Sequence, residues 1–528
     1  MLNQLFSRLW IYGVFCFILL VLVSFWVFKL NQPINIVSPV LNHQKLQCVS
    51  YAPYYGNGQS PFVEGIKISP TQIDSDLKRL ANISDCVRTY SVGQGLDYVP
   101  EAASKIGLKV YLGAWVGWTN SDNEAEIKLA VKRANQYPGT IKALIVGNEV
   151  FLRQEQTPAT MHRYLSYAKS HTNTPITYAE VWEFWNKHQD TAQYVDFVTV
   201  HILPYWEDDP VAIDNAVNHA SNIMHQLATT FKKPILIGET GWPSLGRQRN
   251  ESKPSLINQA RYVREFLQIA HQKNWQYNII EAIDQPWKRV LEGTVGGYWG
   301  IYDTTLLPKF SLSSPVAERV DHALPIYLGL IGAMFFIALA LLAHEKRVAV
   351  LFGSAFLGAT AGLVGMLQYD YLIAACRDTT EWIALGGVAI LGWLAIIFMP
   401  LYLAIKSNAT KQSVNVHAMI KFVNYALMIA AIVASYLIYV DGRYRDYPNL
   451  LFMLPAVILS LGLMLSNSML RTKSQMNYLY CALLFISALL CLLKEPNNLA
   501  ATVWLIINAL MVLSIWPRST SMQTAASN

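Results

Sequence analysis

The sequence predicts a (β/α)8 barrel joined to an α-helical transmembrane region, and three observations lead to this prediction. The chain has 528 residues, more than one ordinary core needs, and 53% of them are apolar, a higher share than soluble domains usually have. Long apolar runs lie near the N-terminus and throughout the chain after Asp321. Between them, roughly 270 residues alternate short β-rich runs with amphipathic stretches, the pattern of parallel strands joined by helices.

The apolar runs predict eight membrane spans. Trp10–Phe28 is long enough to cross the ~30 Å hydrocarbon layer of a bilayer. No Ala-x-Ala-type cleavage site follows before Pro33, so residues 1–30 are expected to form an uncleaved anchor, with a cleaved signal peptide as the alternative. Residues 323–518 are expected to hold seven more spans, followed by a cytoplasmic tail over 519–528. These seven runs lie near residues 324–343, 348–368, 382–405, 418–440, 448–466, 476–493 and 498–516.

The basic residues predict the orientation of the spans, because cytoplasmic loops carry an excess of Lys and Arg. With Arg8 inside, alternate loops are basic and the opposite loops are poorer in Lys and Arg. We therefore expect a multi-pass protein of the cytoplasmic membrane, with both termini cytoplasmic and the barrel periplasmic or extracellular. The basic residues expected on the cytoplasmic side of the later spans are Lys346, Arg347, Lys406, Lys411, Arg471, Lys473 and Arg518.

Two further features bear on the role of the spans. Their ionisable residues lie at the ends, as with Asp370, Lys421 and Lys494, which disfavours an ion-coupled transporter. Gly358 and Gly362 form a small-xxx-small pair that is expected to let two helices pack closely.

The predicted barrel covers residues 45–312 and is electrically neutral, with 26 Lys or Arg and 26 Asp or Glu. A neutral domain is a poor nucleic-acid binder. No Gly-rich phosphate loop follows the first strand, which argues against an open doubly wound sheet. The strands are expected near Gln47–Ala52, Val87–Tyr90, Lys109–Ala114, Ala143–Gly147, Ile176–Ala179, Phe197–His201, Ile235–Gly238 and Asn278–Ala282. The helices are expected near Thr71–Ala81, Glu124–Gln136, Ala159–Ser170, Val211–Thr230 and Ser255–Gln272.

Two of the six cysteines, Cys48 and Cys86, lie in the predicted barrel, and each is near the start of one of two neighbouring strands. A disulfide between them is geometrically feasible in an oxidising compartment. Two buried free thiols are the interpretation we favour from the sequence alone. The scattered cysteines form no CxxC metal or redox motif.

A pair of carboxylates is expected at one end of the barrel. The fourth strand ends in Gly-Asn-Glu at Glu149, and the seventh ends in Gly-Glu-Thr-Gly-Trp-Pro-Ser, which contains Glu239. In such barrels the chemistry lies at the C-terminal strand ends. Two facing carboxylates are what glycoside cleavage requires, one to protonate the leaving oxygen and one to attack the anomeric carbon or to activate water. A single Glu at a strand end could instead cap a helix or pair with Arg88 or Lys288.

These two segments resemble the signatures of glycoside hydrolase family 17, the β-1,3-glucanase family, over roughly residues 45–310. The resemblance implies that Glu149 is the acid/base and Glu239 the nucleophile of a retaining mechanism. It also implies that Asn148 contacts the sugar 2-hydroxyl. Retention would place the two carboxyl groups ~5–5.5 Å apart.

The chain departs from the family pattern at two strand ends. The family's sixth strand usually ends with Asn and a Tyr-Pro-Tyr segment, but here His201 begins His-Ile-Leu-Pro-Tyr-Trp, so only Tyr205 is carried over. The eighth strand resembles the family's acidic ending before Pro-Trp-Lys at Lys288, with Gln285 before the proline.

Further residues after the predicted strands are candidates for sugar binding. Sugar rings stack on indoles, and five tryptophans follow strands on this side, although packing beneath the loops is the alternative for each. Arg88 and Tyr90 are expected to orient Glu239 or the substrate, or to close a buried ion pair. Glu180 either recognises a hydroxyl group or, as we favour, is a solvated loop carboxylate. The tryptophans are Trp115, Trp118, Trp182, Trp242 and Trp287.

The sequence thus predicts a retaining β-glucan glycosidase or glucosyltransferase, most simply for β-1,3-glucan, that acts outside the cytoplasmic membrane. The alternative is a glucan-binding or glucan-export protein with a non-hydrolytic barrel. The expected partners are a β-glucan and the lipid bilayer, with a glucan synthase or an export component as a further candidate. No metal-ligand cluster is apparent and no cofactor is implied. The choice between water and sugar as acceptor, the linkage, the endo or exo mode, the oligomeric state and the role of the helices stay open.

Overall fold

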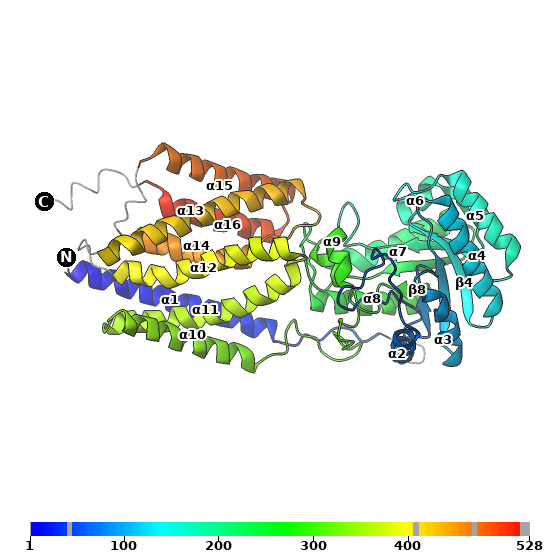
Figure 1. The fold of residues 1–528 in the computed structure, drawn as a ribbon, viewed down its shortest axis with the longest axis horizontal. Helices are drawn as coiled ribbons and strands as arrows, with labels where there is room; N and C mark the ends of the chain where they lie inside the picture. The colour runs from blue at the N-terminus through cyan, green and yellow to red at the C-terminus, as the bar shows by residue number, and fades with distance from the viewer. Residues whose placement is uncertain (1, 40–44, 405–410, 467–472, 518–528) are drawn as a thin grey trace. The chain divides into compact units, whose positions relative to one another are not determined.

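The computed structural model describes residues 2–39, 45–404, 411–466 and 473–517 of the chain. These residues form two compact units. One contains residues 34–246 and 251–316, and the other contains residues 1–33, 247–250 and 317–528. The first unit is the barrel and the second is helical (Figure 1).

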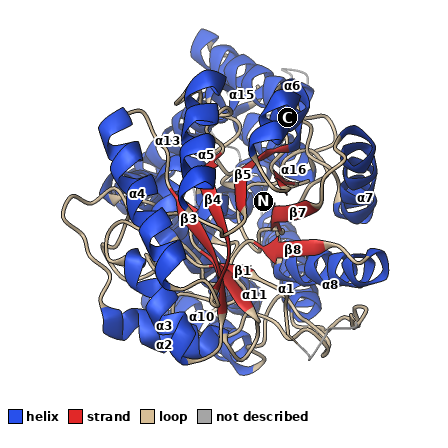
Figure 2. Cartoon of the chain, turned by 90° about the vertical axis from the view of Figure 1, so that its right-hand side faces the viewer, coloured by secondary structure: helices blue, strands red, loops and turns tan. Residues whose placement is uncertain are grey.

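Eight parallel strands form a closed barrel in the order in which they occur along the chain (Figure 2). The (β/α)8 prediction is therefore confirmed. The strands are β1 (Val49–Ser50), β2 (Cys86–Arg88), β3 (Lys109–Ala114), β4 (Ile141–Asn148), β5 (Ile176–Val181), β6 (Val198–His201), β7 (Ile235–Thr240) and β8 (Gln276–Ile279). Each overlaps the strand predicted at its place. The largest difference is at β8, which begins and ends earlier than predicted because residues after Ile279 leave the ladder and Ile283 bridges to Tyr302.

The five predicted barrel helices are present: α2 (Pro70–Leu80), α4 (Asn120–Gln136), α5 (Pro158–His171), α7 (Ile213–Thr230) and α8 (Leu256–Lys273). Their starts follow from local chemistry. Ser69, Thr157 and Ser255 accept a hydrogen bond from a backbone N–H of the first turn, and a proline follows the cap in α2 and α5. The short helices α3 (Val99–Lys105), α6 (Trp182–Lys187) and α9 (Arg289–Glu292) were not predicted, because so few turns show no periodicity.

The apolar core of the barrel unit has two parts. The larger lies between the strands and the surrounding helices and contains side chains such as Val87, Leu112 and Phe266. The smaller is a separate cluster contributed by strand residues and by Cys48, just before β1. Its buried members are Cys48, Cys86, Tyr111, Ala143, Ile145, Ala179 and Leu236.

Cys48 and Cys86 form a disulfide, so the expectation of two free thiols is wrong. The physical reason is the pairing of β1 with β2, which sets Val49 opposite Val87 and places the two cysteine Cα atoms 4.4 Å apart. The four other cysteines, in the helical unit, are buried and take no part in this disulfide.

Removing this disulfide should destabilise the barrel. The bond closes a loop between positions 38 residues apart, and restricting the unfolded chain in this way typically contributes about 2–4 kcal/mol. We expect Cys48→Ala/Cys86→Ala to lower the free energy of unfolding by that amount in urea titrations, and a reducing agent to have the same effect on the wild type. The double variant should not respond to the reducing agent. Equal stability of wild type and variant would contradict the prediction.

The second unit contains helices at all eight positions predicted as spans. Six contain segments long and apolar enough to cross a membrane, and α14 and α16 are shorter, with 17 residues each. The helices are α1 (Leu2–Leu30), α10 (Ala323–Leu342), α11 (Val348–Ala375), α12 (Thr379–Ala404), α13 (Lys411–Val440), α14 (Asn449–Leu465), α15 (Gln475–Lys494) and α16 (Leu499–Ile515). Lys406, Arg471, Arg518 and the expected tail over 519–528 lie outside the described residues.

Close helix packing at Gly358 and Gly362 is confirmed. A Cβ at Gly358 would lie 2.2 Å from the Gly332 carbonyl oxygen, and one at Gly362 would lie 2.1 Å from the Leu328 carbonyl oxygen. Only glycine allows α10 and α11 to approach so closely.

Candidate active site

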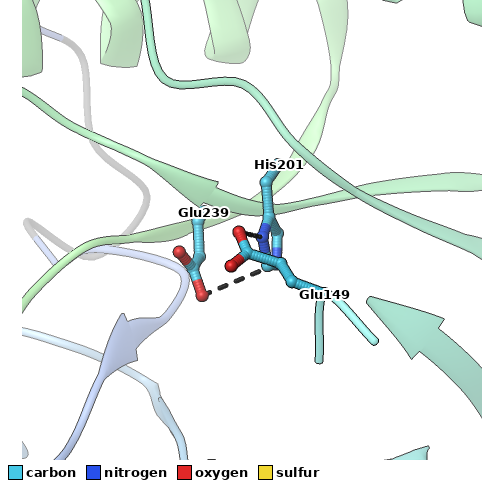
Figure 3. Close-up of side chains that lie close together, drawn as sticks. All are labelled: Glu149, His201 and Glu239. Carbon is cyan, nitrogen blue, oxygen red and sulfur yellow. Dashed lines mark hydrogen bonds and ion pairs between the residues drawn. The ribbon is translucent and has the colours of Figure 1, made fainter. Parts of the chain in front are cut away.

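The C-terminal ends of β4, β6 and β7 bring Glu149, His201 and Glu239 together (Figure 3). One carboxylate oxygen from each glutamate and one ring nitrogen of the histidine all lie within 4.8 Å of one another. Nδ1 of His201 is 2.8 Å from Oε1 of Glu149, and its Nε2 is 3.5 Å from Oε1 of Glu239. The imidazole therefore lies between two carboxyl groups.

Arg88 at the end of β2 holds the nucleophile candidate in place. Its Nη1 donates to Oε1 of Glu239 at 2.9 Å and to the Gly238 carbonyl oxygen at 2.8 Å. Its Nη2 donates to Oδ1 of Asn148. The guanidinium is buried, which favours the ion-pair alternative for Arg88 over direct contact with substrate.

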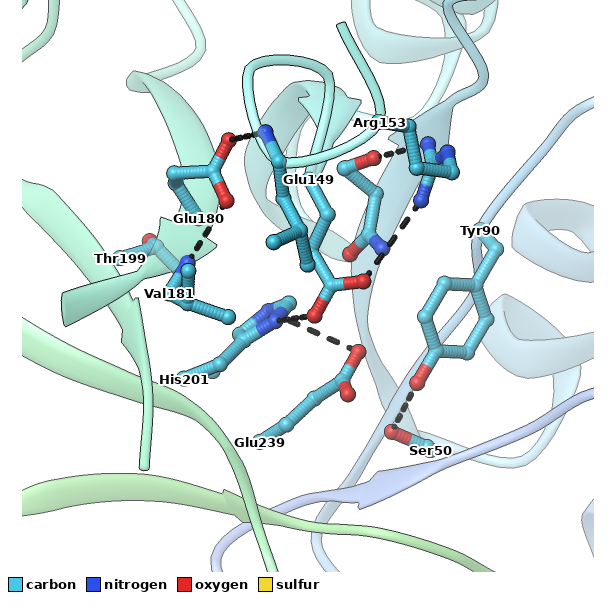
Figure 4. Close-up of polar contacts among 12 residues, drawn as sticks. Ser50, Tyr90, Glu149, Arg153, Glu180, Val181, Thr199, His201 and Glu239 are labelled. Carbon is cyan, nitrogen blue, oxygen red and sulfur yellow. Dashed lines mark hydrogen bonds and ion pairs between the residues drawn. The ribbon is translucent and has the colours of Figure 1, made fainter. Parts of the chain in front are cut away.

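Tyr90 supports this arginine from the other side. Its ring centroid lies 4.6 Å from the guanidinium carbon of Arg88, a cation–π distance. Its hydroxyl donates to Oγ of Ser50 at 2.9 Å (Figure 4). Tyr90 is half-buried and acts on the site through Arg88.

A tight turn at the end of β4 aims the Glu149 side chain. Gly147 has φ +82°, and a Cβ there would lie 2.9 Å from Cε of Met161. Glu149 itself has φ +52°, an uncommon conformation for a residue other than glycine, and its N–H donates to the Ala179 carbonyl oxygen at 2.8 Å. Strained residues of this kind persist where the surrounding structure fixes them, often at functional sites.

Glu180 on β5 fixes the segment that follows Glu149, so the expectation of a solvated carboxylate is wrong. The side chain has no exposed surface. Its Oε2 accepts from the N–H groups of Phe151 and Leu152 at 3.0 and 3.3 Å, and its Oε1 accepts from the N–H of Val181 (Figure 4). A carboxylate that is buried at the end of a barrel strand needs hydrogen-bond donors from the protein, since it is removed from water. The same burial argues against a direct contact with a sugar hydroxyl, which stays a prediction.

Arg153 lies on the other side of Glu149. Its Nη1 is 3.6 Å from Oε2 of Glu149, its Nη2 donates to the Asn148 carbonyl oxygen, and its guanidinium carbon lies 4.5 Å above the Trp115 ring. Burial raises the pKa of Glu149, but the hydrogen bond from His201 and the positive charges of Arg153 and Arg88 outweigh it, so that the net pKa is lowered.

Two of the expected sugar-binding residues are covered by protein. Tyr205 and Trp242 have no exposed surface, and their rings lie 5.8 Å apart in an aromatic cluster with Trp299 and Tyr262. Nε1 of Trp242 donates to the Lys253 carbonyl oxygen. Both residues belong to the core beneath the loops, which favours a packing role, and a contact of Tyr205 or Trp242 with substrate stays a prediction.

Other aromatic residues present surface at this end of the barrel. Trp118 is 71% exposed and Trp115 37% exposed, both in the loop after β3. Trp287, after β8, is half-buried, and Nε1 donates to Oε1 of Gln285 at 2.8 Å. Phe62, in the loop after β1, is 72% exposed and packs edge-on against Trp287 with centroids 5.5 Å apart. Trp182 is half-buried at the start of α6.

Two buried ion pairs fix the segment after β8. Nζ of Lys288 lies 2.8 Å from Oε2 of Glu281, so the lysine expected to bind substrate is engaged by a carboxylate. Nζ of Lys309 lies 2.8 Å from Oδ1 of Asp284 and donates to Oγ of Ser244, the last residue of the Glu239 segment. The ion pair thereby connects the segments after β7 and β8.

The residue types at the site also allow a metal to be considered, since Glu149, His201 and Glu239 offer three ligand atoms. However, Nη1 of Arg88 lies 2.9 Å from Oε1 of Glu239 and 3.3 Å from Nε2 of His201. A fixed positive charge thus already contacts two of the three groups, and a metal ion at the same atoms would meet its repulsion. The donor set fits acid/base chemistry better than metal binding.

Comparison with known families agrees with this geometry. Residues 48–300 match the model of the BtgE/BtgC glycoside hydrolase domain. The barrel is a glycoside hydrolase domain. The match includes β1 to β8 and every residue of the carboxylate site.

Curated relatives of the glycoside hydrolase domain carry related names. The probable beta-glucosidase btgE of Aspergillus fumigatus is 27% identical over 226 residues, which are 41% of this chain and 39% of the relative. The chain thus spans about two fifths of that relative's length. The glucan 1,3-beta-glucosidase of Arthroderma benhamiae is 26% identical over 303 residues, covering 52% of this chain and 96% of the relative. Among solved structures, the family 17 beta-1,3-glucanosyltransferase of Rhizomucor miehei is 23% identical and covers 52% of this chain and 99% of its own, with a TM-score of 0.45.

Sequence reasoning missed several residues of the glycoside hydrolase domain that contact the carboxylates or the aromatics. His201 was noted only as a departure from the family pattern, although its place at the end of β6 is where site residues are expected. Arg153 lies four residues after Glu149, in a turn that periodicity does not show. Phe62 lies in a loop with no motif.

Buried carboxyl groups give the glycoside hydrolase domain a pH-dependent stability. Burial and the nearby charge of Glu149 raise the pKa of Glu180 to about 7. Burial raises the pKa of Glu281 to about 7 and that of Asp284 to about 6. Between about pH 4 and pH 7 these groups hold protons in the folded state that the unfolded chain has lost. Their contribution to stability is therefore present at low pH and is lost as the pH rises through the folded pKa values.

We expect the thermal unfolding midpoint of the full-length protein to decrease as the pH is raised from 5.5 to 8. One extra proton bound in the folded state corresponds to about 1.4 kcal/mol per pH unit. Glu281→Gln removes one of the titrating groups and should make the decline shallower, whatever its effect at a single pH. Scanning calorimetry at several pH values tests this, and a midpoint that rises towards pH 8 would contradict it.

Proposed function

We propose that this protein cleaves β-1,3-glucan outside the cytoplasmic membrane through a covalent glycosyl intermediate, which water or a second sugar then resolves. The observation that carries this proposal is the pair Glu149 and Glu239, on the ends of β4 and β7 of a glycoside hydrolase domain. The names of the relatives, two of which act on β-1,3-glucan by their titles, support the substrate class.

The separation of the carboxyl groups supports retention. One oxygen of Glu149 lies within 4.8 Å of one oxygen of Glu239. Retaining glycosidases hold the two groups ~5–5.5 Å apart, whereas inverting enzymes need ~6.5–9.5 Å to fit a water molecule. The short separation leaves no room for water between Glu239 and the sugar, so that Glu239 itself attacks.

In the first step Glu239 attacks the anomeric carbon and Glu149 protonates the departing glycosidic oxygen. Oε1 of Glu239 accepts from Arg88, which leaves Oε2 to form the bond to carbon. The C–O bond to the leaving sugar breaks, the proton of Glu149 passes to that oxygen, and a glycosyl ester forms on Glu239. Asn148, held by Arg88, lies where the resemblance implies a contact with the 2-hydroxyl.

In the second step Glu149, now ionised, removes a proton from water or from a sugar hydroxyl, and the oxygen so activated attacks the anomeric carbon. The ester bond to Glu239 breaks and both carboxyl groups return to their starting forms. Water gives hydrolysis, and a sugar hydroxyl gives transfer. The exposed Trp115 and Trp118, together with Arg153, lie on the Glu149 side, where a sugar acceptor would stack.

The helices support a location in the membrane. Six described helices are long and apolar enough to cross it. We propose that both termini are cytoplasmic and that the barrel faces the periplasm or the exterior. The Cys48–Cys86 disulfide supports this side, because disulfides persist in oxidising compartments.

The test is to incubate full-length protein in detergent with β-1,3-gluco-oligosaccharides and to follow the size and linkage of the products. Shorter products alone indicate hydrolysis, and longer or branched products indicate transfer. Both must disappear in Glu239→Gln. If the wild type binds glucan but gives no product from several β-glucans, the proposal fails and the glucan-binding or export alternative takes its place.

A further inference from the structure

We propose that His201 is a positioning residue that determines which oxygen of Glu149 carries the catalytic proton. The inference rests on the proposed function and goes beyond it. The family that the sequence resembles usually has Asn at this strand end, so the histidine is a feature of this chain.

The hydrogen bonds around His201 assign the positions of its protons. Nη1 of Arg88 lies 3.3 Å from Nε2, and a guanidinium cannot accept a hydrogen bond, so a proton on Nε2 would point at a positive charge and Nε2 is the unprotonated nitrogen. In the neutral ring the proton is then on Nδ1, and Nδ1–H donates to Oε1 of Glu149 at 2.8 Å (Figures 3 and 4). The groups that face the ring are Arg88, Glu149 and Glu239.

The N–H of His201 distinguishes the two carboxyl oxygens of Glu149. In a protonated carboxyl group the carbonyl oxygen is the stronger hydrogen-bond acceptor, so the oxygen that accepts the N–H bond is favoured as the carbonyl and the proton is favoured on the other oxygen. With Oε1 of Glu149 engaged by His201, the proton sits on Oε2. That oxygen lies on the side of Arg153, and the Glu149 side chain is 20% exposed, so a leaving sugar can reach it. His201 therefore presents a donor oxygen to the substrate without touching the substrate itself.

The barrel is built to hold this ring in one position. The His201 side chain has no exposed surface. A Cβ on Gly238 would lie 3.2 Å from Cδ2 and 3.3 Å from Nε2 of the ring, and 2.5 Å from Cγ2 of Thr199. The glycine before Glu239 thus makes room for the imidazole.

The test compares His201→Phe, which keeps a ring but loses both nitrogens, with His201→Asn, whose amide N–H can still donate to Glu149. Each variant in full-length protein is assayed on β-1,3-gluco-oligosaccharides and on a dinitrophenyl glucoside, whose leaving group needs no proton. His162→Phe, a substitution on α5 where the ring stacks on Tyr194, is the matched control and should match the wild type.

We expect His201→Phe to lower kcat/KM on the oligosaccharide by about 10- to 100-fold, part of the 10²–10⁴ that general acid catalysis contributes. On the dinitrophenyl glucoside the loss should be several-fold smaller. The basic limb of the pH profile should move to higher pH, because the lost N–H had stabilised ionised Glu149. His201→Asn should recover part of the activity.

Equal losses on both substrates with an unmoved basic limb, at wild-type thermal stability, would overturn the inference and leave His201 a packing residue. A wild type inactive on both substrates would instead overturn the proposed function, so the two failures are distinguishable.

Discussion

Replacing Glu239 by Gln should lower the turnover of β-1,3-gluco-oligosaccharides by about 10⁴-fold or more, the scale seen when a covalent nucleophile is removed. The amide keeps the shape of the side chain and can still accept from Arg88, but it cannot form the glycosyl ester. Because the side chain is buried, the variant also removes the partner of the Arg88 charge, so folding is checked by thermal unfolding.

The matched control for this variant is Glu265→Gln on α8, where the glutamate pairs with Arg261 at the surface. It should have wild-type rates. The rates are measured from released reducing sugar and from product size. If the variant keeps activity within about 10-fold of the wild type, the loss is too small for removal of a nucleophile, and Glu239 does not form the intermediate.

Replacing Glu149 by Ala should have the second largest effect, and the effect should depend on the substrate. Without a proton donor, departure of a sugar oxygen slows by about 10²–10⁴-fold. Dinitrophenolate departs from a dinitrophenyl glucoside without protonation, so the glycosyl-enzyme should still form. It should then accumulate, because no base activates water. Added azide needs no base and should restore turnover by forming a glycosyl azide.

This pattern is measured by stopped-flow release of dinitrophenol with and without azide. A burst followed by a slow steady state, accelerated by azide, is the expected result. The same experiment on Glu155→Gln, which alters a carboxylate that pairs with Arg153 near the site, should show no azide effect. Equal loss on both substrates without azide rescue would assign the acid/base role to another residue.

The barrel could be predicted from the sequence because its elements follow from local patterns. Apolar runs such as Lys109–Ala114 have the length of strands, and Ser or Thr followed by Pro marks the starts of α2 and α5. The positions of Glu149 and Glu239 followed from the rule that the ends of parallel strands lie at one end of a barrel.

Whether a side chain after a strand is buried or exposed could not be predicted from these patterns. Trp242 and Trp115 both follow strands, yet one is fully buried and the other exposed, because loop packing is decided by residues distant in sequence. Glu180 looked solvated because its donors, the N–H groups of Phe151 and Leu152, come from another strand's loop.

Contacts between residues of different strands could not be predicted from the sequence either. The disulfide depends on the register of β1 and β2 to within one residue, which propensity does not give. The role of His201 depends on Arg88, from β2, and on Glu149, from β4, and no spacing in the sequence relates the three.

The anomeric configuration of the first product distinguishes double from single displacement. Full-length protein is mixed with a β-1,3-gluco-oligosaccharide, and the anomeric protons are followed by NMR before mutarotation. Attack by Glu239 followed by attack from the acceptor inverts the anomeric carbon twice, so the β-anomer should appear first in the newly formed product. First appearance of the α-anomer would mean a single displacement by water and would contradict the double-displacement mechanism built on Glu149 and Glu239.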